Sequence, residues 1–239
     1  MNSGVTVVIP VFNEADIVET NTRQLVSYLS GLNRSFEVIL VSNGSTDRTD
    51  ELCAGLNRAD PRVRFFSLPE KGVGRAFALG VAQALYDRLV SVDMDLSIDL
   101  DFIPRALDLL DKTNVVVGSK KMGVQHRPLW RRAGSTVFIL AARLLLGLKF
   151  DDYSIAAKAY RRETAIQYLD RIDYGTSYVM DIIYHALTDG FFAIQIPVWC
   201  LDRRPSKFNL PREALYRFRN LFRLWWRYHA RGQRQAPRG

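Results

Sequence analysis

The chain has 239 residues, of which 48% are hydrophobic and 24% are charged. These values are typical of an ordinary globular protein, and the length suits one large domain with a sizeable core. No apolar run approaches the ~18 residues that a membrane-spanning helix needs, and the best candidate, residues 137–148, is too short and contains Arg143. The cysteines and histidines show no zinc-site spacing. We therefore expect reduced cysteines in a cytosolic protein that has no signal peptide.

The net charge of +8 is unevenly distributed along the chain. From Asp202 to the end there are 11 lysines and arginines against 2 acidic residues, whereas residues 1–201 hold 22 basic and 23 acidic residues. The basic excess therefore belongs to the C-terminal segment. Such a segment favours contact with an anionic surface, either membrane headgroups or nucleic acid.

Apolar runs alternate with helical patterns along the chain, which is typical of a mostly parallel sheet flanked by helices. In chain order we predict a strand over 5–9, a helix over 16–32, a strand over 37–41, a helix from 46 to about 56, a strand over 63–66, a helix over 72–85, a strand over 89–92, a helix over 102–111, a strand over 115–117, a helix over 130–148, a strand over 157–160, helices over 162–172 and 177–188, a strand over 191–200 and a helix over 211–231. The expected fold class is therefore α/β.

Polar clusters follow three of these strands. Pro10-Val11-Phe12-Asn13-Glu14 ends the first, Ser42-Asn43-Gly44-Ser45 follows the second, and Asp93-Met94-Asp95 follows the strand at 89–92. The carboxyl ends of parallel strands meet at one edge of the sheet, which is where ligands of open α/β folds bind. Each cluster alone is ordinary turn chemistry. Together, in this order, they predict a binding site on that edge.

Asp93 and Asp95 are the most informative of these residues. Alternate residues of an extended segment face the same side, so the two carboxylates are expected to converge. Converging carboxylates are costly unless a cation lies between them, and a hard divalent ion that carries a diphosphate is the natural occupant. A solvated turn is the competing interpretation, because aspartate is common at the ends of strands.

Later motifs, together with these clusters, resemble those of a known family. They are Gly118-Ser119-Lys120, Trp130-Arg131 with Ser135, Asp152-Tyr153-Ser154-Ile155-Ala156-Ala157-Lys158-Ala159-Tyr160 and Asp202-Arg203-Arg204-Pro205-Ser206-Lys207. From about Val5 to Lys207 the chain resembles the family-2 inverting glycosyltransferases, and within them the dolichol- or polyprenyl-phosphate mannose synthase group. The resemblance implies a type-A, Rossmann-like glycosyltransferase fold with a mostly parallel sheet.

The resemblance also implies roles for the nucleotide-sugar side. Pro10, Phe12 and Glu14 would border the base and ribose, and Asn43 would accept an N–H of the base. Asp93 would face the ribose and diphosphate. The metal ligands implied are Asp93, Asp95 and Ser97, holding Mg²⁺ or Mn²⁺. Arg204 and Lys207 would reach the donor diphosphate.

On the acceptor side, the resemblance places Lys120, Arg131 and Ser135 around a phosphate. A phosphate is already ionised and needs cationic positioning rather than deprotonation. The catalytic set implied is Asp93, Asp95, Lys120, Arg131 and Ser135.

The chain departs from the family pattern at positions that concern specificity. Ser42-Asn43 stands where the family has two aspartates, and because an amide both donates and accepts, the choice of base stays open. Ile155 and Ala156 replace a Ser-Gly pair on the acceptor side, and Asp181 stands where the group has glutamate.

The C-terminal helix has an aromatic side and a basic side. Leu215, Phe218, Leu221, Phe222 and Trp225 lie on one side of a helical wheel, and arginines recur every fourth residue from Arg219 to Arg231. Helices of this kind lie in a membrane interface, although docking onto the domain or an oligomer contact is the alternative. We expect a glycosyltransferase domain over 1–208, with a nucleotide-sugar half 1–120 and an acceptor half 121–208, and a basic amphipathic tail over 209–239.

The expected function is metal-dependent transfer of a hexose, with inversion, from a nucleotide sugar of the GDP-mannose or UDP-glucose type to a polyprenyl or dolichyl phosphate. The alternative is transfer to a sugar hydroxyl with Asp181 as general base. A binding protein without catalysis is a third possibility, which the retention of Asp93 and Asp95 disfavours. The expected partners are a nucleotide sugar, a polyprenyl-phosphate lipid and the cytoplasmic face of a membrane. No nucleic-acid fold motif is present.

Overall fold

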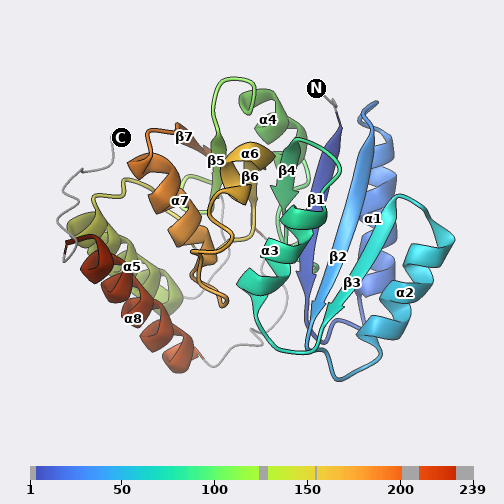
Figure 1. The fold of residues 1–239 in the computed structure, drawn as a ribbon, viewed down its shortest axis with the longest axis horizontal. Coiled ribbons are helices and arrows are strands. Elements are labelled where there is room, and N and C mark those ends of the chain that lie inside the picture. The colour runs from blue at the N-terminus through green and yellow to red at the C-terminus, as the bar shows by residue number, and fades with distance from the viewer. Residues whose placement is uncertain (1–3, 124–128, 154, 201–209, 230–239) are drawn as a thin grey trace.

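The computed structural model describes residues 4–123, 129–153, 155–200 and 210–229, with the side chains of 129–133 and 210 outside this description. Every predicted strand and helix is present (Figure 1). The strands are β1 (Val5–Val11), β2 (Phe36–Asn43), β3 (Val63–Leu68), β4 (Arg88–Ser91), β5 (Val115–Ser119), β6 (Lys158–Arg161) and β7 (Ala193–Pro197). The helices are α1 (Val18–Ser30), α2 (Thr49–Ala59), α3 (Val73–Gln83), α4 (Phe102–Leu109), α5 (Leu129–Leu146), α6 (Arg162–Ile166), α7 (Tyr178–Thr188) and α8 (Leu210–His229).

The strands form one seven-stranded sheet in the order β3-β2-β1-β4-β6-β5-β7. All neighbouring pairs are parallel except those of β6, which runs antiparallel to β4 and β5. Helices α1, α2 and α4 contribute to one hydrophobic cluster, whereas α3, α5, α6, α7 and α8 contribute to the other. Helices therefore cover both faces of the sheet, which explains why β1 and β2 read as continuous apolar runs. The expected α/β fold with a mostly parallel sheet is confirmed.

Helix α6 is shorter than the helix predicted over 162–172, and it ends at Ile166. Beyond it, Tyr168 and Ile172 turn inward and are buried. The Asp173 carboxylate then accepts the backbone N–H groups of Gly175 at 3.0 Å and Ser177 at 3.1 Å. A side chain that satisfies nearby backbone donors in this way competes with the helical hydrogen bonds, so the segment turns and a new helix, α7, starts at Tyr178.

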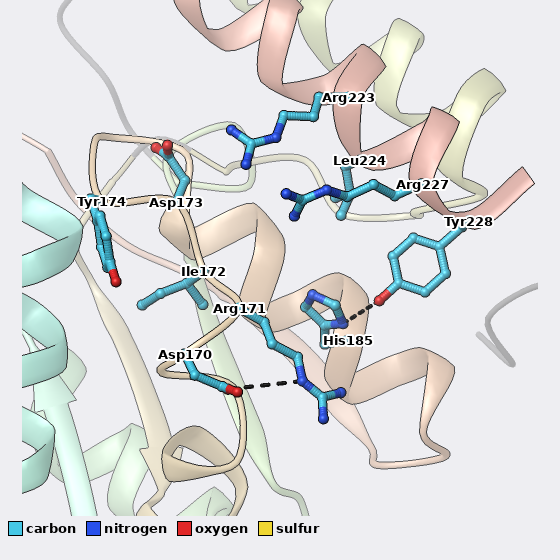
Figure 2. A pocket seen from close by; sticks show the side chains of 10 residues that line it. All are labelled: Asp170, Arg171, Ile172, Asp173, Tyr174, His185, Arg223, Leu224, Arg227 and Tyr228. Atoms are coloured by element: carbon cyan, nitrogen blue, oxygen red, sulfur yellow. Dashed lines mark hydrogen bonds and ion pairs between the residues drawn. The ribbon is translucent and has the colours of Figure 1, made fainter. Parts of the chain in front are cut away.

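Helix α8 docks onto the domain. It lies beside α5 (Figure 1), and its Leu221 and Leu224 are buried in the second hydrophobic cluster. At its C-terminal end the Tyr228 hydroxyl lies 2.6 Å from His185 Nδ1 of α7 (Figure 2). Near its start the Tyr216 hydroxyl donates to the Asp173 carboxylate at 2.6 Å. The helix is therefore held by an apolar seam and by polar contacts at both ends.

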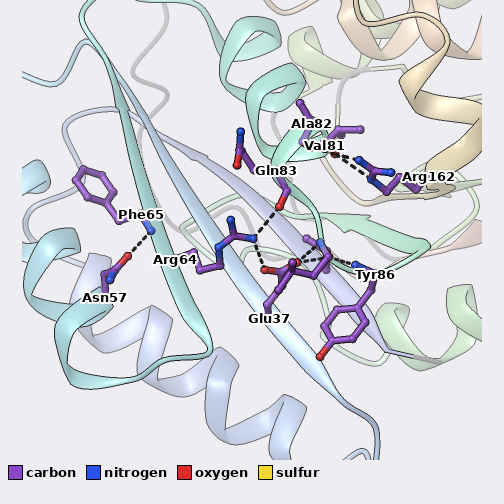
Figure 3. A network of polar contacts seen from close by, with 11 residues as sticks. Glu37, Asn57, Arg64, Phe65, Val81, Ala82, Gln83, Tyr86 and Arg162 are labelled. Atoms are coloured by element: carbon purple, nitrogen blue, oxygen red, sulfur yellow. Dashed lines mark hydrogen bonds and ion pairs between the residues drawn. The ribbon is translucent and has the colours of Figure 1, made fainter. Parts of the chain in front are cut away.

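A buried glutamate organises the opposite, amino-terminal edge of the parallel strands (Figure 3). Glu37 of β2 is only 3% exposed. Its Oε1 accepts the Thr6 hydroxyl and the Leu85 backbone N–H, each at 2.6 Å, and its Oε2 accepts Arg64 Nη1 at 2.8 Å. The same Arg64 nitrogen donates to the Gln83 carbonyl at 2.7 Å. One carboxylate thus joins β1, β2, β3 and the segment that connects α3 to β4.

Glu37→Ala is expected to lower the free energy of unfolding by about 3 kcal/mol, because it leaves the buried donors of Thr6 and Leu85 unpaired. Urea denaturation measures this loss. Glu51→Ala is the matched control, since Glu51 also pairs with an arginine, Arg48, but on an exposed surface. Its midpoint should stay close to that of the wild type. Equal losses in the two variants would contradict a structural role for the Glu37 network.

Candidate functional site

The segments that follow β1 and β2 are joined at the carboxyl edge of the sheet. Asn13 adopts a positive φ of 53°, and its backbone N–H donates to Ser45 Oγ at 3.1 Å. Its side-chain oxygen accepts the Thr46 N–H at 2.8 Å. The Glu14 N–H donates to Thr49 Oγ1 at 2.8 Å. The first two sequence clusters are therefore brought into direct contact.

Asn43 links these turns to the start of α3. It is buried, its Nδ2 donates to the Val11 carbonyl at 2.7 Å, and its Oδ1 accepts the Gly72 N–H at 3.2 Å. Pro10, Phe12 and Glu14 are half-buried along the same rim. Lys71, which the sequence did not single out, lies 3.9 Å above the Phe12 ring. A lysine over an aromatic ring is a favourable cation–π contact, and it places a positive charge on this rim.

Asp93 and Asp95 lie just beyond the end of β4, on either side of Met94, which is buried. Asp95 Oδ1 accepts the Ser97 backbone N–H at 3.0 Å, which shapes the turn. The Asn21 side chain of α1 donates to the Met94 carbonyl at 2.9 Å and ties the turn to the domain. The pair is thus held on a defined loop rather than on a free strand end.

Asp93 is exposed to solvent on one side, and protein groups surround its carboxyl on the others. Burial raises the pKa of Asp93 to about 6, and the nearby charge of Asp95 raises it further, while Lys120, the Ala156 N–H and Lys158 act in the opposite direction. A carboxyl in this setting is a poor place for an uncompensated negative charge. A cation held between Asp93 and Asp95 would relieve that cost.

Two lysines stand near the aspartate pair. Lys120, which follows β5, lies 3.7 Å from the Asp152 carboxylate, and both side chains are largely buried. Lys158 of β6 is fully buried, and its Nζ donates to the Ile155 carbonyl at 2.8 Å. Burial, aided by the charge of Lys120, lowers the pKa of Lys158 to about 8, against the opposing effects of Asp152 and Asp93.

Lys158 lies within the motif at 152–160, but the sequence alone does not single it out as a candidate site residue. The available signal was a lysine flanked by alanines inside a predicted strand, at 157–160, where a fully buried cation is unusual. The structure relates it electrostatically to Asp93 and Asp152.

The net charge at this edge of the sheet is compatible with a bound divalent ion. Asp93, Asp95 and Asp152 carry three negative charges against two positive charges on Lys120 and Lys158 when all are ionised, a local −1. Within the part of the chain that the structure describes, no cluster of three or more candidate ligands is found. Two carboxylates fit Mg²⁺ or Mn²⁺, since such ions take few protein ligands and keep oxygens of water or substrate.

The remaining predicted site residues are only partly described. Ser135 lies half-buried in α5. Arg131 is also in α5, but its side chain lies outside the described residues, as do Arg204 and Lys207 entirely. Ser97 lies on the loop of the aspartate pair, where its backbone contacts Asp95.

Asp181, the general base of the alternative mechanism, is buried in α7. Its carboxylate accepts the Asp173 N–H at 2.7 Å. Burial raises the pKa of Asp181 to about 7. It lines a small cavity together with Asn220 and Arg223 of α8, so its surroundings come from the C-terminal helix as well as from the domain.

Comparisons with known proteins show that the chain is similar to glycosyltransferases. Over 235 residues the chain is 28% identical to glycosyltransferase AglD of Haloferax volcanii, covering 95% of this chain and 38% of AglD. Over 160 residues it is 33% identical to the undecaprenyl-phosphate 4-deoxy-4-formamido-L-arabinose transferase of Pseudomonas syringae, covering 66% of this chain and 47% of that protein. The chain thus spans less than half the length of either relative.

Among solved structures, glucosyl-3-phosphoglycerate synthase of Mycobacterium tuberculosis in complex with UDP has a TM-score of 0.68 at 19% identity, covering 93% of this chain and 80% of that one. The same enzyme with Mn²⁺, UDP-glucose and phosphoglyceric acid has a TM-score of 0.64 at 18% identity, covering 91% and 79%. These likenesses concern the fold. The family model "Glycosyl transferase family 2" matches residues 6–169, and the chain belongs to that glycosyltransferase family.

Proposed function

We propose that the protein transfers a hexose, with inversion, from a nucleotide sugar of the GDP-mannose or UDP-glucose type to a polyprenyl or dolichyl phosphate. The observation that carries this proposal is the position of Asp93 and Asp95 beside Lys120 and Lys158 at the carboxyl edge of the sheet. Membership of the glycosyltransferase family supports the reaction class. A relative named as an undecaprenyl-phosphate sugar transferase supports the acceptor class.

On the donor side, the base and ribose would lie along Pro10, Phe12, Glu14 and Asn43, at the joined ends of β1 and β2. Asp93 and Asp95 would hold Mg²⁺ or Mn²⁺, with Ser97 shaping their loop. The ion, when bound, would supply Lewis-acid neutralisation of the leaving diphosphate. Structural neighbours of the same fold that were solved with Mn²⁺ or Mg²⁺ support the choice of a divalent ion. Arg204 and Lys207 are proposed to contact the diphosphate from the segment between β7 and α8.

On the acceptor side, Lys120, Arg131 and Ser135 are proposed to hold the lipid phosphate. Lys120 is already positioned by Asp152 at the end of β5. A phosphate oxygen attacks without needing a general base, so the work of these side chains is orientation and charge pairing. Lys158 stabilises the backbone at the same edge, because its ammonium group donates a hydrogen bond to the Ile155 carbonyl.

A lipid acceptor requires the protein to work at a membrane surface. In the described part of the chain, no helix is both long and apolar enough to cross a membrane. Helices α5 and α8 expose large apolar side chains, among them Leu144 at 85%, Leu215 at 72% and Trp226 at 59%. Aromatic and basic residues on one helix favour the headgroup region of a bilayer. We call the exposed apolar side chains of these two helices, with the arginines of α8, the α5–α8 face. We propose that the α5–α8 face holds the protein on the cytoplasmic surface of a membrane.

Acceptor kinetics test the proposed function. Lys120→Ala and Arg131→Ala should each raise the KM for polyprenyl phosphate at least tenfold, because a charge-assisted contact contributes about 1.5–3 kcal/mol. The KM for the nucleotide sugar should stay nearly constant. If both variants weaken the donor and leave the acceptor unchanged, the two sides of the site are assigned wrongly.

Lys120→Ala also removes a partner of the buried Asp152, so it needs a control for stability. In the double variant Lys120→Ala/Asp152→Asn the unpaired charge is gone, and the unfolding free energy should recover relative to Lys120→Ala. The raised KM for the lipid should persist. This separates a direct role for the Lys120 ammonium from a general loosening of the site.

Asp181→Asn distinguishes the proposed function from transfer to a sugar hydroxyl. The amide can still accept the Asp173 N–H, so the fold should be kept. With a phosphate acceptor, kcat should fall no more than a few-fold. A general base contributes about 10²–10⁴-fold, so a loss of that size at normal stability would favour the hydroxyl acceptor. The pKa of Asp181, about 7, is the feature that keeps this alternative worth testing.

A further inference from the structure

A cavity of about 780 Å³ lies between α8, α7 and the segment that precedes α7, and none of the residues proposed to bind the nucleotide or the metal lines it. Arg223, Arg227 and Tyr228 line it from α8, and Arg171 and Tyr174 line it from the opposite segment (Figure 2). This volume is that of a site for an organic ligand rather than for a single ion.

Two of the arginines have no directly bonded protein partner in the described structure, although both interact electrostatically with the buried carboxyl of Asp181. Arg223 and Arg227 stand one helical turn apart on α8, and among the described residues neither forms a hydrogen bond or an ion pair. Figure 2 shows both side chains extending from α8 toward the segment at 170–174. Residues four apart on a helix are neighbours, with Cβ atoms about 5–6 Å apart. The two guanidinium groups can therefore contact one ligand group together.

The acidic and titratable groups around the cavity are already engaged, including Asp181 of the adjoining small cavity, which accepts the Asp173 N–H. The Asp173 carboxylate accepts the Tyr216 hydroxyl at 2.6 Å and the N–H groups of Gly175 and Ser177. Asp170 lies 3.8 Å from Arg171. His185 is engaged through Nδ1 with Tyr228. Burial lowers the pKa of His185 to about 4, so this ring is neutral at physiological pH.

We propose that this cavity binds a phosphate ester, with Arg223 and Arg227 gripping its phosphate group and the tyrosines lining the space for its organic part. Planar guanidinium groups match phosphate oxygens and bind them in pairs. A phosphate monoester has three terminal oxygens and up to two negative charges, so it can pair with both guanidinium groups more fully than a carboxylate can. The organic part is either small and soluble or belongs to a phospholipid headgroup, since α8 also carries the apolar face proposed to meet the membrane.

Direct binding tests this proposal without any glycosyl transfer, so its outcome is independent of the proposed function. Glycerol 3-phosphate is titrated by calorimetry, and vesicles of phosphatidylcholine with and without phosphatidic acid are tested by cosedimentation. The variants are Arg223→Gln/Arg227→Gln and, as matched control, Arg219→Gln. Arg219 is an exposed arginine of the same helix that does not line the cavity.

The double variant should weaken binding of one of these phosphate probes at least 30-fold, whereas Arg219→Gln should change it less than threefold. A loss confined to glycerol 3-phosphate identifies a soluble ester, and a loss confined to phosphatidic acid identifies a headgroup. Thermal unfolding of the double variant should stay close to that of the wild type, because neither side chain forms a hydrogen bond or an ion pair with a described residue, and Asp181, with a pKa of about 7, can take up a proton when the arginine charges are removed. Equal losses in the Arg219 variant, or no phosphate-dependent binding by the wild type, would overturn the proposal.

Discussion

Asp95→Asn is expected to reduce kcat by about three orders of magnitude while leaving the fold intact. An ion that neutralises a leaving diphosphate contributes several kcal/mol to the transition state, and about 4 kcal/mol corresponds to a thousandfold in rate. The asparagine oxygen can still accept the Ser97 N–H, so the loop keeps its shape. Removing one of two like charges also relieves the repulsion that raises the pKa of Asp93. Stability should therefore be unchanged or slightly higher.

The measurement is steady-state turnover over a Mg²⁺ and Mn²⁺ titration, with thermal unfolding alongside. Asp99→Asn is the matched control, because Asp99 lies on the same loop and accepts the Trp199 N–H at 2.7 Å. It should keep wild-type turnover. Wild-type turnover by Asp95→Asn at saturating Mg²⁺ would show that the pair does not hold the ion.

The sequence predicted the elements well because their signals are local. Apolar runs at β1, β2 and β5 and helical periodicity at α1 and α4 follow directly from burial on one or both faces. The direction of β6 was not predicted, since an apolar run is the same whether a strand is parallel or antiparallel. The early end of α6 was also missed, because the chain beyond Ile166 continues in turns, such as that closed by the Arg171 N–H and the Tyr168 carbonyl, which no local sequence signal marks.

The site was only partly predictable for a similar reason. Residues at strand ends, such as Asn43 and Asp93, are found by their position after an apolar run. Lys158 and Lys71 are recognised only through neighbours that are distant in sequence, since Lys158 is related to Asp93 and Lys71 lies over Phe12. The phosphate-ester cavity is harder still. A helical wheel shows an arginine stripe on α8 but cannot show that it borders a segment about 50 residues earlier.

The docking of α8 changes how the membrane surface must be tested. Removing the helix would uncover the apolar seam around Leu221 and Leu224 and confuse unfolding with loss of binding. Point substitutions on the exposed side avoid this. Phe222 and Trp226 are 53% and 59% exposed, and each fully buried side chain of this size contributes about 1.5–3 kcal/mol.

Phe222→Ser/Trp226→Ser is therefore expected to weaken binding to anionic vesicles about 30- to 100-fold without loss of thermal stability. Headgroup attraction to the α8 arginines is screened by salt, so salt should detach this variant completely but the wild type only in part. Phe192→Ser/Trp199→Ser is the matched control, because it replaces the same residue types at 72% and 65% exposure, on the segments that flank β7 rather than on α5 or α8. Cosedimentation measures all three proteins. If the control pair loses as much binding as Phe222→Ser/Trp226→Ser, the attachment reflects general apolar exposure, and the α5–α8 face is not the membrane contact.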